Sequence, residues 1–151
     1  IGLASELFVR MYPHYSSLEQ VIRLSSVLEK TSENRQKTQR LYEAQCHGVI
    51  AGIVRDAIAC GDLTVPGAVT PESILFGLWA ITFGGVALFN STETMSDMGL
   101  HEPWQALRQN QMTLIDGYGW QPLTVDYPFA ETQQRLETEV FGPEFQQLAA
   151  P

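Results

Sequence analysis

The feature that most constrains this fold is a run of sixteen residues, Ile74 to Phe89, without a charged side chain. Thr70-Pro71-Glu72 precedes it and is typical of a helix start: a capping hydroxyl, a proline at the first helical position and a carboxylate near the positive helix end. The run is shorter than the ~20 apolar residues that cross a bilayer, and Thr82, Gly84 and Gly85 interrupt it. We therefore predict a buried helix and no membrane span. A helix that is apolar on all sides has to be covered on all sides.

The helical period divides this run into a bulky side and a strip of small residues. One chain of this size can cover the bulky side with its other helices. We expect a second subunit to cover the strip of small residues. A later helix, opened by Pro103 and ended by Gly117 and Gly119, carries an apolar stripe of its own. We expect helices 72–90 and 104–118 of two copies to form a four-helix contact about a two-fold axis, which makes the protein a homodimer. The expected interface residues are Gly77, Ala80, Gly84, Ala87, Leu88, Trp104, Leu107, Gln111, Leu114 and Tyr118.

The N-terminal part predicts two further helices. Apolar residues at helical spacing predict a first helix that ends near Tyr12, because Pro13 cannot continue it. Ser16 and Glu19 then match a capping box, in which the hydroxyl and the carboxylate satisfy amide groups at the start of a helix. We expect this second helix to run to about Lys30.

The longest helix is expected from about Asn34 to Cys60, closed by Gly61 in the left-handed conformation with Leu63 packed back on it. A last amphipathic helix begins after Asp126-Tyr127-Pro128 and is stopped by Gly142-Pro143. Strand patterns hardly occur. A chain of 151 residues with 44% hydrophobic content has the usual size of one domain. We predict an all-α fold, an antiparallel bundle of about six helices, in which residues 1–151 form a single ligand-binding and dimerisation domain.

Charge and motif content disfavour nucleic-acid binding and catalysis. The 17 acidic and 9 basic side chains give a net charge of -8, which repels phosphate backbones. His14, His47 and His101 fall in three different elements, without the i, i+4 spacing of a zinc pair. The sequence contains no Cys-x-x-Cys, no phosphate-binding glycine loop and no nucleophile elbow. We expect no enzyme activity, no metal and no cofactor.

The two cysteines indicate a reducing compartment. Cys46 and Cys60 fall on one predicted helix, where a rise of ~1.5 Å per residue separates them by roughly 21 Å. They cannot form a disulfide within one chain. Because the chain also carries no recognisable secretory signal, we expect a cytoplasmic protein.

Three motifs occur in an informative order. The long helix ends in Cys60-Gly61-Asp62-Leu63, a loop leads to Pro71-Glu72 and an apolar helix with Gly84-Gly85, and residues 114–123 read Leu-Ile-Asp-Gly-Tyr-Gly-Trp-Gln-Pro-Leu. Together they cover about half of the chain. In this order they resemble the C-terminal domain of TetR-family transcriptional regulators, where a Gly-x-Leu helix closure and a helix ending similar to the third motif are frequent.

The resemblance implies an all-helical domain that dimerises through a four-helix bundle and holds a small-molecule pocket among its other helices. It implies the effector-sensing half of a regulator, typically a repressor that a small molecule releases from DNA. The helix-turn-helix domain that precedes this half in the family has no counterpart here. DNA contact is therefore expected only through an N-terminal domain that this chain does not contain.

We expect the ligand pocket between the long helix and the chargeless helix, as an apolar cavity with a few hydroxyl and thiol groups. For each residue ordinary core packing is the alternative, and the aromatic and acidic content is compatible with a cationic effector. Two other classes of function stay open: a helical enzyme or apolar-ligand carrier unrelated to transcription, and a purely structural dimerisation module. The expected ligand-binding residues are Met11, Tyr12, Tyr42, Cys46, Val49, Ile50, Trp79 and Phe83.

Overall fold

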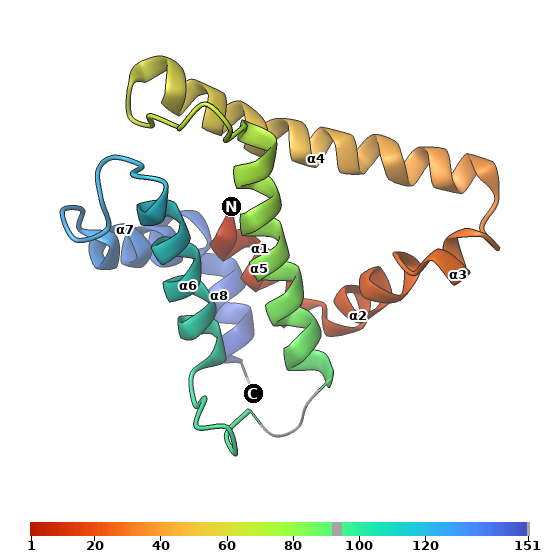
Figure 1. The fold of residues 1–151 in the computed structure, drawn as a ribbon. Helices are drawn as coiled ribbons and strands as arrows, with labels where there is room; N and C mark the ends of the chain where they lie inside the picture. Colours follow the sequence, from red (N-terminus) through yellow and green to blue (C-terminus); the bar gives the residue numbers. More distant parts are fainter. Residues whose placement is uncertain (92–94, 151) are drawn as a thin grey trace.

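The computed structural model describes residues 1–91 and 95–150, and within these ranges every regular element is helical (Figure 1). The predicted all-α class is confirmed. The described residues form eight α-helices and one π-helical segment, rather than about six helices. They are α1 (Gly2–Met11), α2 (Pro13–Ile22), α3 (Ser25–Leu28), α4 (Glu33–Cys60), α5 (Pro71–Ser91), α6 (Pro103–Gly117), α7 (Phe129–Arg135), η1 (Leu136–Val140) and α8 (Gly142–Ala149).

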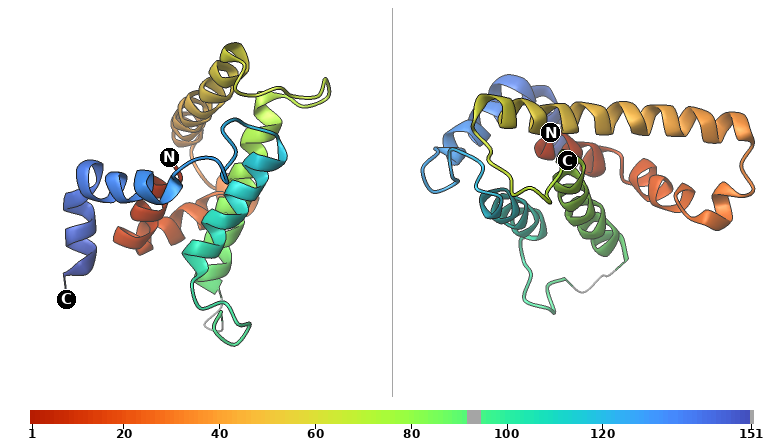
Figure 2. Two further views of the ribbon diagram at one scale, coloured as in Figure 1. Left: turned by 90° about the vertical axis from the view of Figure 1, so that its left-hand side faces the viewer. Right: turned by 45° about the horizontal axis from the view of Figure 1, so that its top comes forward.

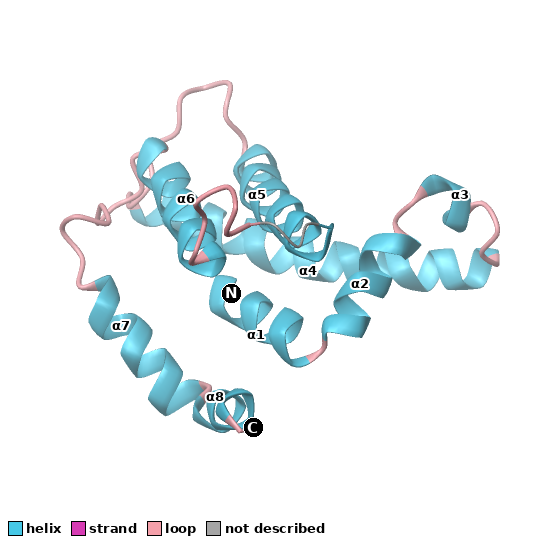
Figure 3. Cartoon of the chain, turned by 90° about the horizontal axis from the view of Figure 1, so that it is seen from below, coloured by secondary structure: helices cyan, strands magenta, loops and turns pink. Residues whose placement is uncertain are grey.

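Helices α5 and α6 form an antiparallel pair, and α4 crosses the N-terminal end of α5 (Figures 1 and 2). Helix α1 lies between this pair and the C-terminal helices α7 and α8, as Figure 3 shows from below. The N-terminal half of α4 extends away from the pair of α5 and α6, and α2 and α3 lie beneath this half of α4 (Figure 2). The helices therefore do not all run along one common axis.

The end of α4 has the predicted geometry. Gly61 takes the left-handed conformation, with φ 86° and ψ 4°, and its N–H donates to the Ile58 carbonyl at 3.2 Å. The Leu63 N–H then donates to the Ala57 carbonyl at 3.1 Å, and the Leu63 side chain is only 1% exposed. The glycine closure and the packing of Leu63 are both confirmed. This turn builds the main core cluster, which consists of Val54, Ala57, Leu63 and Ile74.

The start of α5 is also as predicted. The Thr70 hydroxyl accepts the Ser73 N–H at 3.2 Å, and Pro71 is the first helical residue. A capping side chain of this kind typically contributes about 1 kcal/mol to helix stability.

Two glycines of α5 allow α6 to approach closely. A Cβ added at Gly85 would lie 2.9 Å from Leu107 Cδ1, and one at Gly77 would lie 3.1 Å from Leu114 Cδ2. The expected stripe of α6 therefore packs against α5 of the same chain. Six of the expected interface residues make contacts within the subunit, and their contact with a second copy stays a prediction: Gly77, Trp104, Leu107, Gln111, Leu114 and Tyr118.

The predicted boundaries of the second helix are wrong. Pro13 ends α1 but also opens α2, so Ser16 lies inside α2, where it is 3% exposed, and does not cap a helix. Helix α2 ends at Ile22, and Leu24 is extended, with φ -67° and ψ 133°. A proline marks a boundary in both directions, because it fits the first turn of a helix as well as it stops the preceding one. Pro143 does the same at the start of α8.

The face of α4 that meets the other helices also differs from the expected one. Tyr42, Cys46 and Val49, which were expected to line the ligand pocket, are exposed on the outside of α4. The inward face carries the half-buried or buried side chains Glu43, His47, Ile50, Val54 and Ala57, of which Ile50 was expected at the pocket.

Helix α5 is only partly covered within one chain, and the sequence predicts that a second subunit covers the rest. Phe76, Ala80 and Leu88 are exposed, and a Cβ at Gly84 would meet nothing within 4 Å. We call these four residues, which follow one another at intervals of four, the outer ridge of α5. By length and composition alone, residues Pro71–Asn90, with mean hydropathy 1.6, are also long and apolar enough to cross a membrane, as core helices of soluble proteins can be.

A buried carboxylate ties α1 to α6. Glu6 is 5% exposed, and its two oxygens accept from Arg10 of α1, at 3.1 Å, and from Arg108 of α6. Because both arginines pair with the Glu6 carboxylate, its negative charge is compensated although the group is shielded from water. The contact fixes α1 against the helix pair across 102 positions of sequence.

Glu6→Gln tests this contact. The amide keeps the shape but leaves two guanidinium groups without their carboxylate. Removing one partner of a fully buried pair costs about 3 to 5 kcal/mol, and the partial exposure of both arginines reduces the expected loss to about 2 kcal/mol. Urea denaturation of the two proteins measures the difference. Glu139→Gln, which disrupts an exposed i, i+4 pair with Arg135, is the control and should leave stability unchanged. Equal effects of the two substitutions would contradict the assigned role of Glu6.

Candidate ligand-binding site

A cavity of about 400 Å³ lies between α1, α4, α5 and α6. Among the described residues that line it, none is Asp, Glu, Lys or Arg. Its volume falls within the range of ~300 to 1,000 Å³ that is usual for small-molecule sites. The apolar wall includes Ile50 and Val54 of α4, Leu75, Leu78 and Trp79 of α5, Ile115 of α6 and Trp120 in the following loop.

The cavity contains one ordered polar group on its α5/α6 side. The Thr82 hydroxyl donates to the Leu78 carbonyl at 2.7 Å and accepts an N–H of the Gln111 carboxamide at 2.8 Å. Thr82 thereby fixes the orientation of Gln111. Among the described residues, the Gln111 oxygen and its second N–H make no further hydrogen bond. Gln111 therefore offers one donor and one acceptor in a mainly apolar wall, which also contains Ser5 and His47.

Trp79 separates this cavity from a second cleft of about 500 Å³. On the side of the first cavity, the Trp79 ring lies 5.3 Å from the His47 ring, measured between centroids. On the side of the second cleft, the guanidinium carbon of Arg23 lies 5.4 Å from the Trp79 centroid and 5.7 Å from that of Phe83. We call this second space the Arg23 cleft.

Arg23 connects three helices at this cleft. Its Nη1 donates to Glu43 of α4 at 2.7 Å, and its Nη2 donates to Glu19 of α2 at 2.8 Å. A guanidinium over an aromatic face is attracted by the ring quadrupole. This contact already occupies the aromatic faces of Trp79 and Phe83, so a cationic effector would have to displace Arg23 there.

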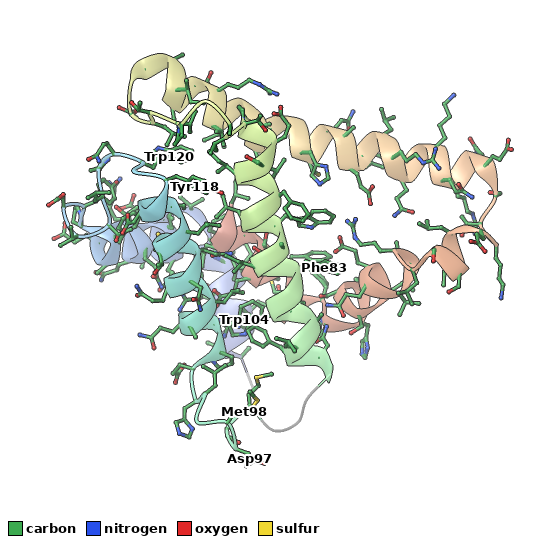
Figure 4. All side chains as sticks on the ribbon, viewed as in Figure 1. Phe83, Asp97, Met98, Trp104, Tyr118 and Trp120 are labelled. Carbon is green, nitrogen blue, oxygen red and sulfur yellow. The ribbon has the colours of Figure 1, made fainter. Side chains whose placement is uncertain are left out.

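The structure brings only some of the expected ligand-binding residues together. Ile50 and Trp79 line the first cavity, and Phe83 lines the Arg23 cleft and a third hollow of about 400 Å³ against α1 and α2. Figure 4 shows Phe83 on the side of α5 that faces α2, away from Trp104. The other five expected residues do not line these spaces. They are Tyr42, Cys46 and Val49 on the outside of α4, and Met11 and Tyr12 at the junction of α1 and α2.

Most residues that line the cavity were not among the expected ligand-binding residues, including the polar or aromatic side chains of His47, Thr82, Gln111 and Trp120. A signal for two of them was present. Thr82 lies within the chargeless run, and Gln111 lies on the apolar stripe of α6. A polar side chain on a buried face needs a hydrogen-bond partner, and these two side chains provide one for each other.

The remaining expected interface residues lie on α5. Ala80, Gly84 and Leu88 belong to the outer ridge, and Ala87 is half-buried. Phe76, Ala80 and Gly84 also line the Arg23 cleft. A partner placed on the outer ridge would therefore cover the mouth of this cleft.

A double-mutant cycle of Arg23→Met and Glu43→Gln tests the link between α2 and α4. Hydrogen bonds to charged groups contribute about 1.5 to 3 kcal/mol, and partial exposure of both side chains reduces the expected coupling free energy to about 1 kcal/mol. Chemical denaturation of the four proteins measures it. The exposed pair Arg55 and Glu72, replaced in the same way, is the control and should couple weakly. Additive effects of Arg23→Met and Glu43→Gln would contradict the link.

No protein-family model, no curated protein and no solved structure matches this chain.

Proposed function

We propose that this chain is the effector-binding and dimerisation half of a TetR-type transcriptional regulator. The observation that carries the proposal is the apolar cavity between α1, α4, α5 and α6, with a single oriented carboxamide. A uniformly packed core would not leave about 400 Å³ around such a group. Ligand sites in helical proteins commonly lie between helices in this way.

The positions of two of the three motifs that resemble the family support the proposal. The Asp116 carboxylate accepts the N–H of Thr124 at 2.9 Å and also its hydroxyl, which closes the loop after α6. The Gln121 N–H donates to the Asp62 carbonyl at 2.7 Å, in the turn that closes α4. Two motifs about sixty residues apart in sequence are thus joined, and Trp120 of the second motif lines the cavity.

The dimer is proposed on the outer ridge of α5. Phe76 is 64% exposed and Leu88 is 55% exposed, on a helix that carries no charge from Ile74 to Phe89. An apolar surface of this kind is a typical core of an obligate interface, which buries on the order of 2,000 Å² or more. Ridges at intervals of four residues pack well against each other, and Ala80 and Gly84 leave room for a second helix.

Gly84→Leu tests the dimer. The leucine should overpack the contact and weaken it by about 1 to 3 kcal/mol. Sedimentation at micromolar concentration should show a dimer for the unaltered protein and more monomer for the variant. Gly48→Leu, on an exposed part of α4 where a Cβ also meets nothing within 4 Å, is the matched control and should stay dimeric.

A single species of 16.8 kDa for the unaltered chain would rule out the dimer. Flotation with lipid vesicles tests the alternative that a membrane, and not a second subunit, covers the apolar surface of α5. Binding to vesicles by a monomer would favour a membrane over a second subunit.

The proposed role in transcription has an independent test in the coding DNA. We expect the reading frame directly upstream of Ile1 to encode a helix-turn-helix domain. Purified longer protein should then bind a DNA fragment from its own promoter region in a gel-shift assay, whereas the 151-residue chain should not. An unrelated upstream sequence would favour an apolar-ligand carrier, which could use the same cavity without DNA.

A further inference from the structure

The walls of the cavity between α1, α4, α5 and α6 determine which charge a ligand can carry. The described lining residues include no Asp, Glu, Lys or Arg, and besides Thr82 and Gln111 the polar lining groups include Ser5, His47 and the backbone of the N-terminal residue Ile1. Charged side chains on neighbouring elements are paired with each other, since Glu6 accepts from Arg10 and Arg108, and Arg23 donates to Glu19 and Glu43. An ion placed in an apolar cavity without a counter-ion loses its hydration and gains no partner. The wall offers no carboxylate to an ammonium ligand and no arginine or lysine to a carboxylate ligand, so the cavity disfavours both.

The Gln111 carboxamide determines where a ligand can carry a polar group. Its free oxygen and N–H can serve one hydroxyl, carbonyl or amide of a ligand. Because Thr82 is itself anchored to the Leu78 carbonyl at 2.7 Å, the carboxamide is held in one orientation and does not have to be ordered on binding.

The volume sets an approximate ligand size. A dry cavity of about 150 Å³ holds one benzene molecule. At about 400 Å³, this cavity has room for a ligand of about two to three rings.

We propose that the cavity binds an uncharged, mainly apolar ligand of two to three rings, with one hydrogen-bonding group directed at Gln111. This rests on the proposed function, in which the same cavity is the effector site. This uncharged ligand takes the place of the cationic effector with which the sequence composition alone is compatible.

A matched series of probes tests the inference: naphthalene, 2-naphthol, 2-naphthoate and 2-naphthylmethylammonium, titrated into the whole chain at neutral pH. We expect 2-naphthol to bind most tightly. Naphthalene, which lacks the hydroxyl, should bind about 2- to 10-fold more weakly. The two ions, which have the same ring system, should bind at least about 100-fold more weakly than 2-naphthol.

Variants at Gln111 locate the effect. Gln111→Met should bind 2-naphthol and naphthalene equally well, because it removes the hydrogen bond but keeps the apolar volume. Gln109→Met is the control on the exposed side of α6 and should keep the preference for 2-naphthol. Gln111→Glu supplies a second readout, because its carboxylate should increase the affinity for 2-naphthylmethylammonium. Circular dichroism verifies the helical fold of each variant.

The outcomes separate this inference from the proposed function. If the neutral probes bind and 2-naphthoate or 2-naphthylmethylammonium binds as tightly, the inference is overturned while the effector site stands. If Gln111→Met keeps the preference for 2-naphthol, the assigned role of Gln111 is overturned. If none of the four probes binds, both the inference and the cavity's role as an effector site are overturned.

Discussion

The rest of the structure depends on the covering of α5. A helix without a charge over sixteen residues gains stability on every side from which water is removed, and each neighbouring helix covers a different sector of it. Helix α6 covers one side, where Gly77 and Gly85 accept the leucines of α6. Helix α4 crosses its N-terminal end above Ile74. These neighbours leave the outer ridge of α5 exposed. The proposed dimer contact and the proposed ligand cavity therefore both involve α5.

Trp79 is the wall common to the hollow parts of the molecule. It lines the cavity, the Arg23 cleft and the third hollow against α1 and α2. Its two sides differ in chemistry, with a histidine ring on one and a paired guanidinium on the other. A ligand that moves this ring in the cavity would also disturb the contact by which Arg23 holds α2 to α4. The geometry thus connects the candidate site to the N-terminal helices through one side chain.

Polar contacts position the helices that apolar packing leaves undetermined. Helix α1 contributes the buried Leu7, but Glu6 fixes it against α6 through Arg108. The loop after α6 is held by Asp116 and by the backbone bond to Asp62. Apolar contacts are not directional and tolerate small displacements, whereas a buried carboxylate keeps its hydrogen bonds only in a narrow range of positions.

The sequence by itself determined the helical class and several helix ends, because these depend on neighbouring residues. The threonine cap before Pro71 and the glycine closure at Gly61 are local chemistry and can be read directly. Pro13 and Pro143 could not be interpreted in the same way, since a proline can end one helix and open the next. Only the tertiary structure decided which face of α4 points inward, that the stripe of α6 packs within its own chain, and that Thr82 meets Gln111. Helical periodicity determines which residues share a face, but the partner of that face depends on contacts between residues far apart in the chain.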